Sequence, residues 1–361
     1  MEKKSLMSIG LKRLKDILRS LIRLSRLVMR KPANSCGFRG VYIDIEGIKH
    51  GYLFEGKFEE SRTDFDEFII TPTFFNAHTH LGDSIAKDPP YMDLVKMVGP
   101  NGYKFQVLRS NSSDELRRAI LEEIEIAIRS GTGYFLDFRE SGMEGLKIVE
   151  GINRLIPLGR PRDIEEALKM SCFGFAMSSV RDHEIDLLFS LRRIASKRGI
   201  IFAIHAGEMN CEDVERTVEL KPDLVVHMNR CPEMLRHFME EGIPIVSCIR
   251  SNAFFDLLNP AVYRTLASYE NWLLGTDNGM LFNPSMLEEM HFSALIVKND
   301  WAIFRGAVYG FRIFEKKFKL KKSYIVFHRK WNFRNSKNIL STLVRRASLS
   351  DIEAIVEPPV S

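Results

Sequence analysis

Short apolar runs alternate with charged, amphipathic stretches between residues 72 and 300, and this alternation restricts the possible folds more than any other feature of the chain. The runs are TFFNAH, GYFLDF, NRLIPL, SCFGFAM, IIFAIH, LVVHM, IPIVSC and WLLGTD. Several of the stretches between them, such as DELRRAILEEIEIAIRS and DHEIDLLFSLRRIASKRG, have helical spacing. Eight strands that alternate with helices close into a parallel (β/α)8 barrel. We therefore predict an α/β fold with a TIM-type barrel over residues 72–303.

The segments on either side of the predicted barrel have a different pattern. Residues 36–71 contain the β-like pieces VYIDIEGI, HGYLFEGKF and EFII, which are too few to bury a core alone. Similar pieces, KSYIVFH and the segment near residues 352–356, lie close to the other end of the sequence. We expect residues 36–71 and 304–361 to build one small β-domain that flanks the barrel.

Residues 1–35 are predicted to form a basic amphipathic helix. Its apolar residues recur at three- and four-residue steps, and arginines occupy the other faces. Residues 1–31 hold ten Lys or Arg against two acidic residues, a balance of +8, so the overall charge of +5 leaves −3 for the rest. We interpret this helix as an appendage packed on its own protein or on a partner subunit. Contact with an anionic membrane or nucleic acid is the alternative.

Composition and cysteine usage indicate a globular, cytoplasmic protein. The chain has 361 residues, of which 45% are hydrophobic and 27% charged, and no apolar run approaches the roughly 20 residues that span a bilayer. Its start has no signal-peptide pattern. The five cysteines are odd in number and lack C-x-x-C spacing. We therefore expect reduced thiols rather than a disulfide framework or a cysteine zinc site.

Polar, metal-competent residues stand where four of the predicted strands end. His78 and His80 close the first strand with one residue between them, so that both point to the same face. His205 and His227 end the fifth and sixth strands, and Asp277 ends the eighth. Because a barrel brings these ends to one rim, the nitrogen and oxygen donors suit Zn²⁺ or Fe²⁺ with an open position for water.

The motifs HTHLGDS, HAGE, VVH, SCIRSN and LGTDNG, taken in this order, resemble the metal-dependent amidohydrolase superfamily, especially its aminohydrolase and chlorohydrolase branch. That branch includes cytosine, guanine and S-adenosylhomocysteine deaminases. The resemblance implies that one metal ion per chain is bound by His78, His80, His205 and Asp277. It also implies that Glu208 is the acid/base and that His227 orients or polarises the attacking water, with Asp277 able to take the water's proton.

The predicted function is hydrolysis of a C–NH₂ group on a purine, pyrimidine or pterin type of heterocycle by a metal-activated water. A catalytic zinc lowers the pKa of its water from 15.7 to about 7, which supplies the nucleophile. Hydrolysis of a cyclic amide C–N bond or a ring halide at the same site is the alternative among enzymes. A non-catalytic barrel that contacts a membrane or nucleic acid is the alternative from another class. A homo-oligomer is compatible with all three.

Other polar residues near the motifs have two interpretations each. Asp83 and Ser84 either line the pocket or cap the segment that follows, and Asn229 and Arg230 could reach a purine or a phosphate. Arg139 and Glu140 follow the second strand and could contact substrate, but a surface ion pair is the default expectation. Asn252 is expected to hold the loop after the seventh strand. The fourth strand contains no lysine that could bridge a second metal.

Overall fold

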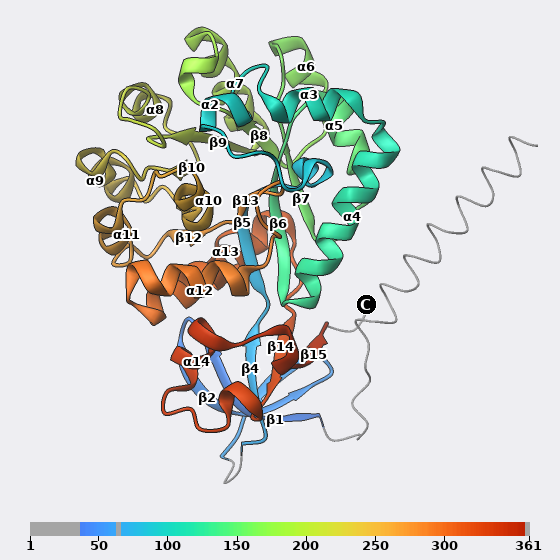
Figure 1. Cartoon of the computed structure of the whole chain (residues 1–361), viewed down its shortest axis with the longest axis vertical. Helices are drawn as coiled ribbons and strands as arrows, with labels where there is room; N and C mark the ends of the chain where they lie inside the picture. The colour runs from blue at the N-terminus through green and yellow to red at the C-terminus, as the bar shows by residue number, and fades with distance from the viewer. Residues whose placement is uncertain (1–36, 63–65, 358–361) are drawn as a thin grey trace, which may run out of the picture.

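The computed structural model describes residues 37–62 and 66–357, and it confirms the predicted barrel with a small flanking sheet (Figure 1). The predicted basic helix over residues 1–35 lies outside the described residues. Every one of the predicted apolar runs forms a barrel strand. The strands are β5 (Phe74–His80), β6 (Thr132–Arg139), β7 (Leu155–Gly159), β8 (Gly174–Met177), β9 (Ile201–Ala206), β10 (Leu224–His227), β11 (Ile245–Ser247), β12 (Trp272–Leu274) and β13 (Asp277–Asn278).

The eighth strand of the barrel is divided into β12 and β13 by Gly275 and Thr276. The first part pairs in parallel with β11, and the second part pairs in parallel with β5. The sheet order β12-β11-β10-β9-β8-β7-β6-β5-β13 is therefore closed on itself. Gly275 is needed at the break, because a Cβ there would lie 2.8 Å from the backbone nitrogen of His78.

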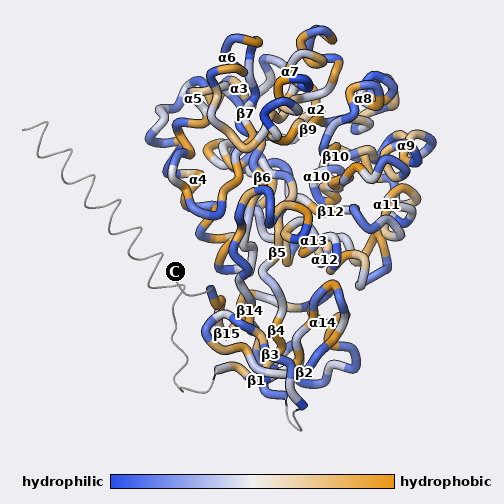
Figure 2. Tube along the Cα trace, turned by 180° about the vertical axis from the view of Figure 1, so that it is seen from behind, coloured by the Kyte–Doolittle hydropathy of each residue, from blue (hydrophilic) through white to orange (hydrophobic). Residues whose placement is uncertain are grey.

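Helices surround the barrel in the order that the spacing predicts. They are α4 (Ser113–Arg129), α5 (Gly142–Ile148), α6 (Ile164–Lys169), α7 (Ile185–Arg198), α8 (Val214–Leu220), α9 (Leu235–Glu240), α10 (Ile249–Phe254), α11 (Pro260–Leu266), α12 (Met286–Val297) and α13 (Asp300–Phe318). The helix α4 begins with a capping box in which Ser112 and Glu115 satisfy each other's backbone N–H groups. Figure 2 shows apolar and polar residues alternating along these helices, as expected for elements that cover a core on one face.

Two short helices, α2 (Leu94–Val98) and α3 (Tyr103–Ser110), lie between β5 and α4 at the end of the barrel where β5 finishes (Figure 1). A 3-10 helix, η1 (Leu81–Ala86), precedes them directly after the histidine pair. Further 3-10 turns are η2 (Val180–Asp182), η3 (Pro232–Met234), η4 (Trp331–Phe333) and η5 (Leu349–Asp351). The loop after the first barrel strand is thus long and structured.

The flanking sheet is built from both ends of the described chain, in the order β15-β14-β4-β1-β2-β3. Its strands are β1 (Phe38–Asp44), β2 (Gly47–Phe54), β3 (Lys57–Glu60), β4 (Phe68–Pro72), β14 (Tyr324–His328) and β15 (Ile352–Val356), and α14 (Ile339–Arg346) packs nearby. The strand β4 leads into β5, which connects the sheet to the barrel. The last barrel helix, α13, crosses the expected boundary at residue 303, because Phe314 stacks on Phe75 of β5.

Both faces of the first barrel strand are buried, which explains its mostly apolar composition before the histidines, and the one polar residue there, Asn76, donates to the hydroxyl of Thr276 over 2.7 Å. All seven residues of β5 are buried, with α13 on the outside and the barrel interior on the other face. Within the described residues, no helix is long and apolar enough to cross a membrane.

Candidate metal centre

The structure brings the strand-end histidines and Asp277 together at the carboxyl-terminal rim of the barrel. His78 Nε2 lies 3.2 Å from Asp277 Oδ1 and 3.3 Å from His205 Nε2. His80 Nε2 lies 3.7 Å from the same Asp277 oxygen. Two ligands that each stand about 2.1 Å from one tetrahedral ion are about 3.4 Å apart. The donor atoms of His78, His80 and Asp277 lie within 4.8 Å of one another, and so do those of His78, His205 and His227, so these two groups, which share His78, could each hold a metal ion.

Contacts at Nδ1 of His205 and His80 leave Nε2 of each ring available to a metal ion. His205 Nδ1 lies 2.9 Å from the carbonyl oxygen of Met177, to which it donates. His80 Nδ1 lies 2.8 Å from Glu140 Oε1, and a carboxylate at this distance favours the tautomer with the hydrogen on Nδ1. With Nδ1 carrying the hydrogen, Nε2 of each ring has a free lone pair directed at the cluster.

Burial keeps the imidazoles of His78 and His205 neutral, as metal ligation requires. It lowers the pKa of His78 from 6.5 to about 3. It also lowers the pKa of His205 well below the usual value, and the neighbouring His78 acts in the same direction. Burial alone would raise the pKa of Asp277, but the hydrogen bond with His78 and the surrounding histidines hold it well below its usual value. The neutral imidazoles of His78 and His205 thus lie beside an ionised Asp277 carboxylate.

Ser251 orients Asp277, and the sequence analysis missed this residue. Its Oγ donates to Asp277 Oδ2 over 2.5 Å, which leaves Oδ1 facing the histidines. Asn252, the polar residue singled out from the motif, instead donates to the hydroxyl of Tyr263 over 2.8 Å and so connects α10 to α11. Asp277 has a left-handed backbone conformation with φ of 60°. Non-glycine residues held in this region are typical of functional sites.

Glu208 and His227 lie beside the four candidate ligands. His227 Nε2 is 3.5 Å from Glu208 Oε1, and one ligand atom from each of Glu208, His227 and Asp277 lies within 4.8 Å of the others. Burial raises the pKa of the Glu208 carboxyl group. Asn229 donates to the backbone oxygen of Glu208 over 3.2 Å and so fixes the loop that carries it. The arrangement places a proton-transfer group next to the cluster.

The expectation of a surface ion pair at Arg139 and Glu140 is wrong. These side chains are 4% and 3% exposed, respectively. They are covered because η1 and α3 fold back over the end of β6 and supply Asp83 and Lys104 to the same cluster. Lys104 was not a sequence candidate, since a lysine in a helix of mixed composition is usually solvated. Asp83 belongs to this buried cluster, while Ser84 donates to the Leu81 carbonyl within η1.

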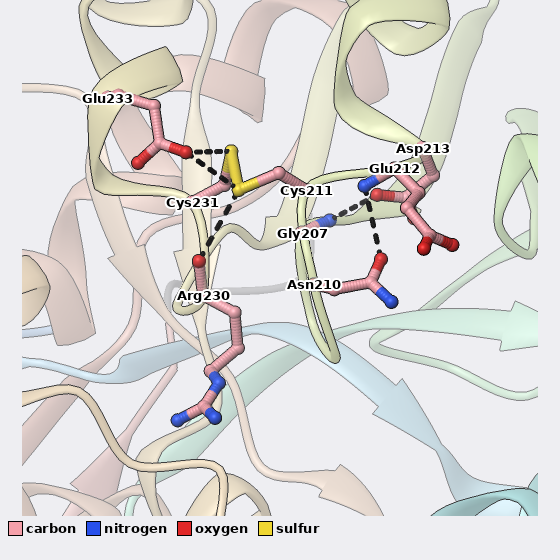
Figure 3. The surroundings of a disulfide bond; sticks show 8 residues. All are labelled: Gly207, Asn210, Cys211, Glu212, Asp213, Arg230, Cys231 and Glu233. Carbon is pink, nitrogen blue, oxygen red and sulfur yellow. Dashed lines mark hydrogen bonds between the residues drawn. A yellow bond between two sulfur atoms is a disulfide. The ribbon is translucent and has the colours of Figure 1, made fainter.

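The expectation of reduced cysteines is also wrong at one pair. Cys211 and Cys231 form a disulfide with a Cα–Cα distance of 5.1 Å. Figure 3 shows this bond between the loops that follow β9 and β10, with Glu233 beside it. The pairing has no sequence motif because adjacent strands of the barrel, not local spacing, bring the two residues together. Cys172 and Cys248 are free.

The bond joins the loop that carries Glu208 to the loop that follows His227. Glu233 Oε1 lies 2.9 Å from Cys211 Sγ. Cys211, Cys231 and Glu233 form another group whose atoms are close enough to hold a metal ion. The disulfide leaves no thiolate for such binding. The histidine–aspartate cluster is therefore the stronger candidate centre among the described residues.

Comparisons with known proteins show the family of the chain and agree with its fold. No protein-family model matches the sequence. The chain is 50% identical over 321 residues to an Archaeoglobus fulgidus protein named "Putative aminohydrolase", covering 88% of this chain and 96% of that protein. It is 26% identical over 348 residues to the 5-methylthioadenosine/S-adenosylhomocysteine deaminase of Thermococcus onnurineus, covering 80% and 81% respectively. Its fold matches the zinc-bound adenosine deaminase from Xanthomonas campestris with a TM-score of 0.69 at 14% identity, covering 91% of this chain and 93% of that chain.

A parallel barrel with histidine and aspartate donors at its carboxyl-terminal rim defines the class of metal-dependent barrel hydrolases. The chain belongs to the metal-dependent amidohydrolase superfamily, in its aminohydrolase branch. This confirms the resemblance that the motifs indicated. The protein is an aminohydrolase-type enzyme that acts on non-peptide C–N bonds. The donor set at the rim could hold a metal ion.

Proposed function

We propose that this enzyme deaminates an amino-substituted heterocycle of the purine, pyrimidine or pterin type, with one Zn²⁺ held by His78, His80, His205 and Asp277. Fe²⁺ suits the same donors and is the alternative metal. The observation that carries the proposal is the position of Glu208. Its carboxyl group lies 3.5 Å from His227 and beside the cluster, where a ring nitrogen and an exocyclic amine would need a proton donor.

When bound, the ion would activate water: it would lower the pKa of the water to about 7 and so make hydroxide available at neutral pH. Glu208 donates its proton to the ring nitrogen next to the carbon under attack. Asp277, whose Oδ2 is held by Ser251, receives the proton of the attacking water. His227 orients that water from the opposite side. The amine leaves as ammonia after a proton returns to it, and the carbon keeps the oxygen.

The same geometry and one relative support the proposed substrate class. An acid next to a ring nitrogen suits an amidine-like carbon, as in adenine, guanine or cytosine rings. The relative from Thermococcus onnurineus carries the name of a deaminase of 5-methylthioadenosine and S-adenosylhomocysteine, which are purine nucleosides. Hydrolysis of a cyclic amide or a ring halide would use the same attack. Ammonia release from a panel of aminated heterocycles separates deamination from these reactions.

Glu208→Gln tests the assignment. The amide keeps the shape of the side chain but cannot transfer the proton, so turnover should fall by about 10²- to 10⁴-fold while zinc stays bound. Glu212→Gln is the matched control, because Glu212 lies on the same loop but pairs with Arg181 at the surface. Activity within a few-fold of wild type in Glu208→Gln would refute the acid/base role. Two zinc equivalents in fully active protein would refute the single-ion centre.

A further inference from the structure

A second cluster of ionised side chains lies next to the candidate metal centre without contributing a ligand to it. It consists of Asp83, Lys104, Asp137, Arg139 and Glu140, and no member is more than 4% exposed. Buried charges are costly unless each is paired, so a cluster of this size at the rim of an active site is kept for a reason beyond packing.

Glu140 is the member that touches the metal centre. Its Oε1 lies 2.8 Å from His80 Nδ1, which is the ring nitrogen that faces away from the other ligands. The same oxygen lies 2.6 Å from Lys104 Nζ, and Oε2 accepts from Arg139 Nη2 over 2.9 Å. Both carboxylate oxygens are thus occupied, and the side chain is held in one position.

Lys104 reaches this carboxylate from outside the barrel. It lies on α3, and its Nζ also stands 2.9 Å from Asp83 Oδ2 in η1. Arg139 is paired in turn with Asp137, at 3.3 Å, and Asp137 accepts the backbone N–H of Leu81 over 2.7 Å. The cluster therefore connects the segment that crosses the end of the barrel to the second histidine of the β5 pair.

The physical consequence is a fixed tautomer and a fixed ring orientation. A carboxylate beside Nδ1 favours the tautomer with the hydrogen on Nδ1, which leaves the Nε2 lone pair for a metal and makes the imidazole a stronger donor. The cluster contains three carboxylates and two cations, so it also carries one negative charge that favours a nearby dication. Without Lys104, the Glu140 carboxylate would lose one of its two cations and its fixed position.

We propose that Glu140 is a positioning residue for His80 and that Lys104 of α3 holds Glu140 in place, so that the α3 segment contributes to metal affinity. The proposal rests on the metal centre of the proposed function. It assigns no proton transfer to Glu140 or Lys104 and no contact with substrate.

The experiment measures zinc affinity of the full-length protein by competition with a chromogenic chelator, together with the visible absorption spectrum of the Co²⁺-substituted protein. The variants are Glu140→Gln, Lys104→Met and the double variant. Each single variant should bind zinc about 10- to 100-fold more weakly and shift the Co²⁺ bands. Because Lys104 acts through Glu140, the double variant should lose little more than Glu140→Gln alone.

Glu166→Gln is the matched control. Glu166 is also buried and pairs with an arginine, Arg162 at 3.1 Å, but it touches no candidate ligand. Its zinc affinity and Co²⁺ spectrum should equal those of wild type. If Lys104→Met does not fold, as judged by circular dichroism, the zinc affinity and Co²⁺ spectrum of Glu140→Gln alone test the positioning role of Glu140.

Two outcomes separate this proposal from the proposed function. Wild-type affinity and an unchanged Co²⁺ spectrum in folded Glu140→Gln would overturn the positioning role while the metal centre stands. A wild-type protein that binds no zinc or Co²⁺ would overturn both. Equal and additive losses in Lys104→Met and Glu140→Gln would overturn the claim that Lys104 acts through Glu140.

Discussion

Reduction of the Cys211–Cys231 disulfide should destabilise the protein by an amount that the structure allows us to calculate. The bond closes a loop with a sequence separation of 20 residues. Loop-closure entropy for about 20 residues is about 11 cal/mol/K, which corresponds to about 3 kcal/mol at 25 °C. For a chain of this length the same free energy lowers the melting temperature by about 4 °C.

The assay compares urea and thermal unfolding of the protein with and without a thiol reductant. Alkylation of the unreduced, urea-unfolded protein should label three of the five cysteines, because two are joined. The double variant Cys211→Ser/Cys231→Ser is the control, and its melting temperature should not respond to the reductant. Turnover should also fall on reduction, since the bond fixes the loops that carry Glu208 and follow His227.

Two results would refute this reasoning. Labelling of all five cysteines before reduction would show that the bond is absent in the purified protein. A melting temperature that changes by less than about 1 °C on reduction, with the thiols shown to be free, would mean that the closed loop contributes almost nothing.

Three further predictions concern other parts of the chain. Arg250→Met should destabilise the fold by about 3–5 kcal/mol in urea unfolding, because it leaves the fully buried Glu289 carboxylate without its cation. In the wild type this carboxylate lies 2.8 Å from the Arg250 guanidinium. A loss of stability under about 1 kcal/mol would contradict this. Gly275→Ala should cost about 1–3 kcal/mol and reduce zinc content, since its Cβ would lie 2.8 Å from the His78 backbone nitrogen; full zinc occupancy would count against the close packing of β12 and β5. Deletion of residues 1–31 should leave turnover and zinc content unchanged, because that segment holds no candidate ligand. A folded but inactive truncation would disprove the interpretation of this segment as an appendage to the enzyme.

The barrel and the candidate ligands were predictable because both depend on local periodicity. Each strand is a short apolar run, and the polar residue at its end marks the rim, so His78, His205 and Asp277 could be placed without knowing any long-range contact. The break in the eighth strand at Gly275 was not visible, since the run WLLGTD reads as continuous.

The supporting residues could not be predicted because they depend on the path of loops. Lys104 meets Glu140 across 36 residues only because α3 folds back over the end of β6. Ser251 rather than its neighbour Asn252 faces Asp277, and that choice is set by the phase of α10. The Cys211–Cys231 pair likewise depends on β9 and β10 being adjacent.

The most direct test of the metal centre is a crystal structure of the zinc-loaded protein with anomalous diffraction recorded on both sides of the zinc absorption edge. The account predicts one anomalous peak per chain, about 2.0–2.2 Å from the nitrogen or oxygen donors of His78, His80, His205 and Asp277. No peak at this cluster, or a peak between Cys211, Cys231 and Glu233 instead, would contradict it.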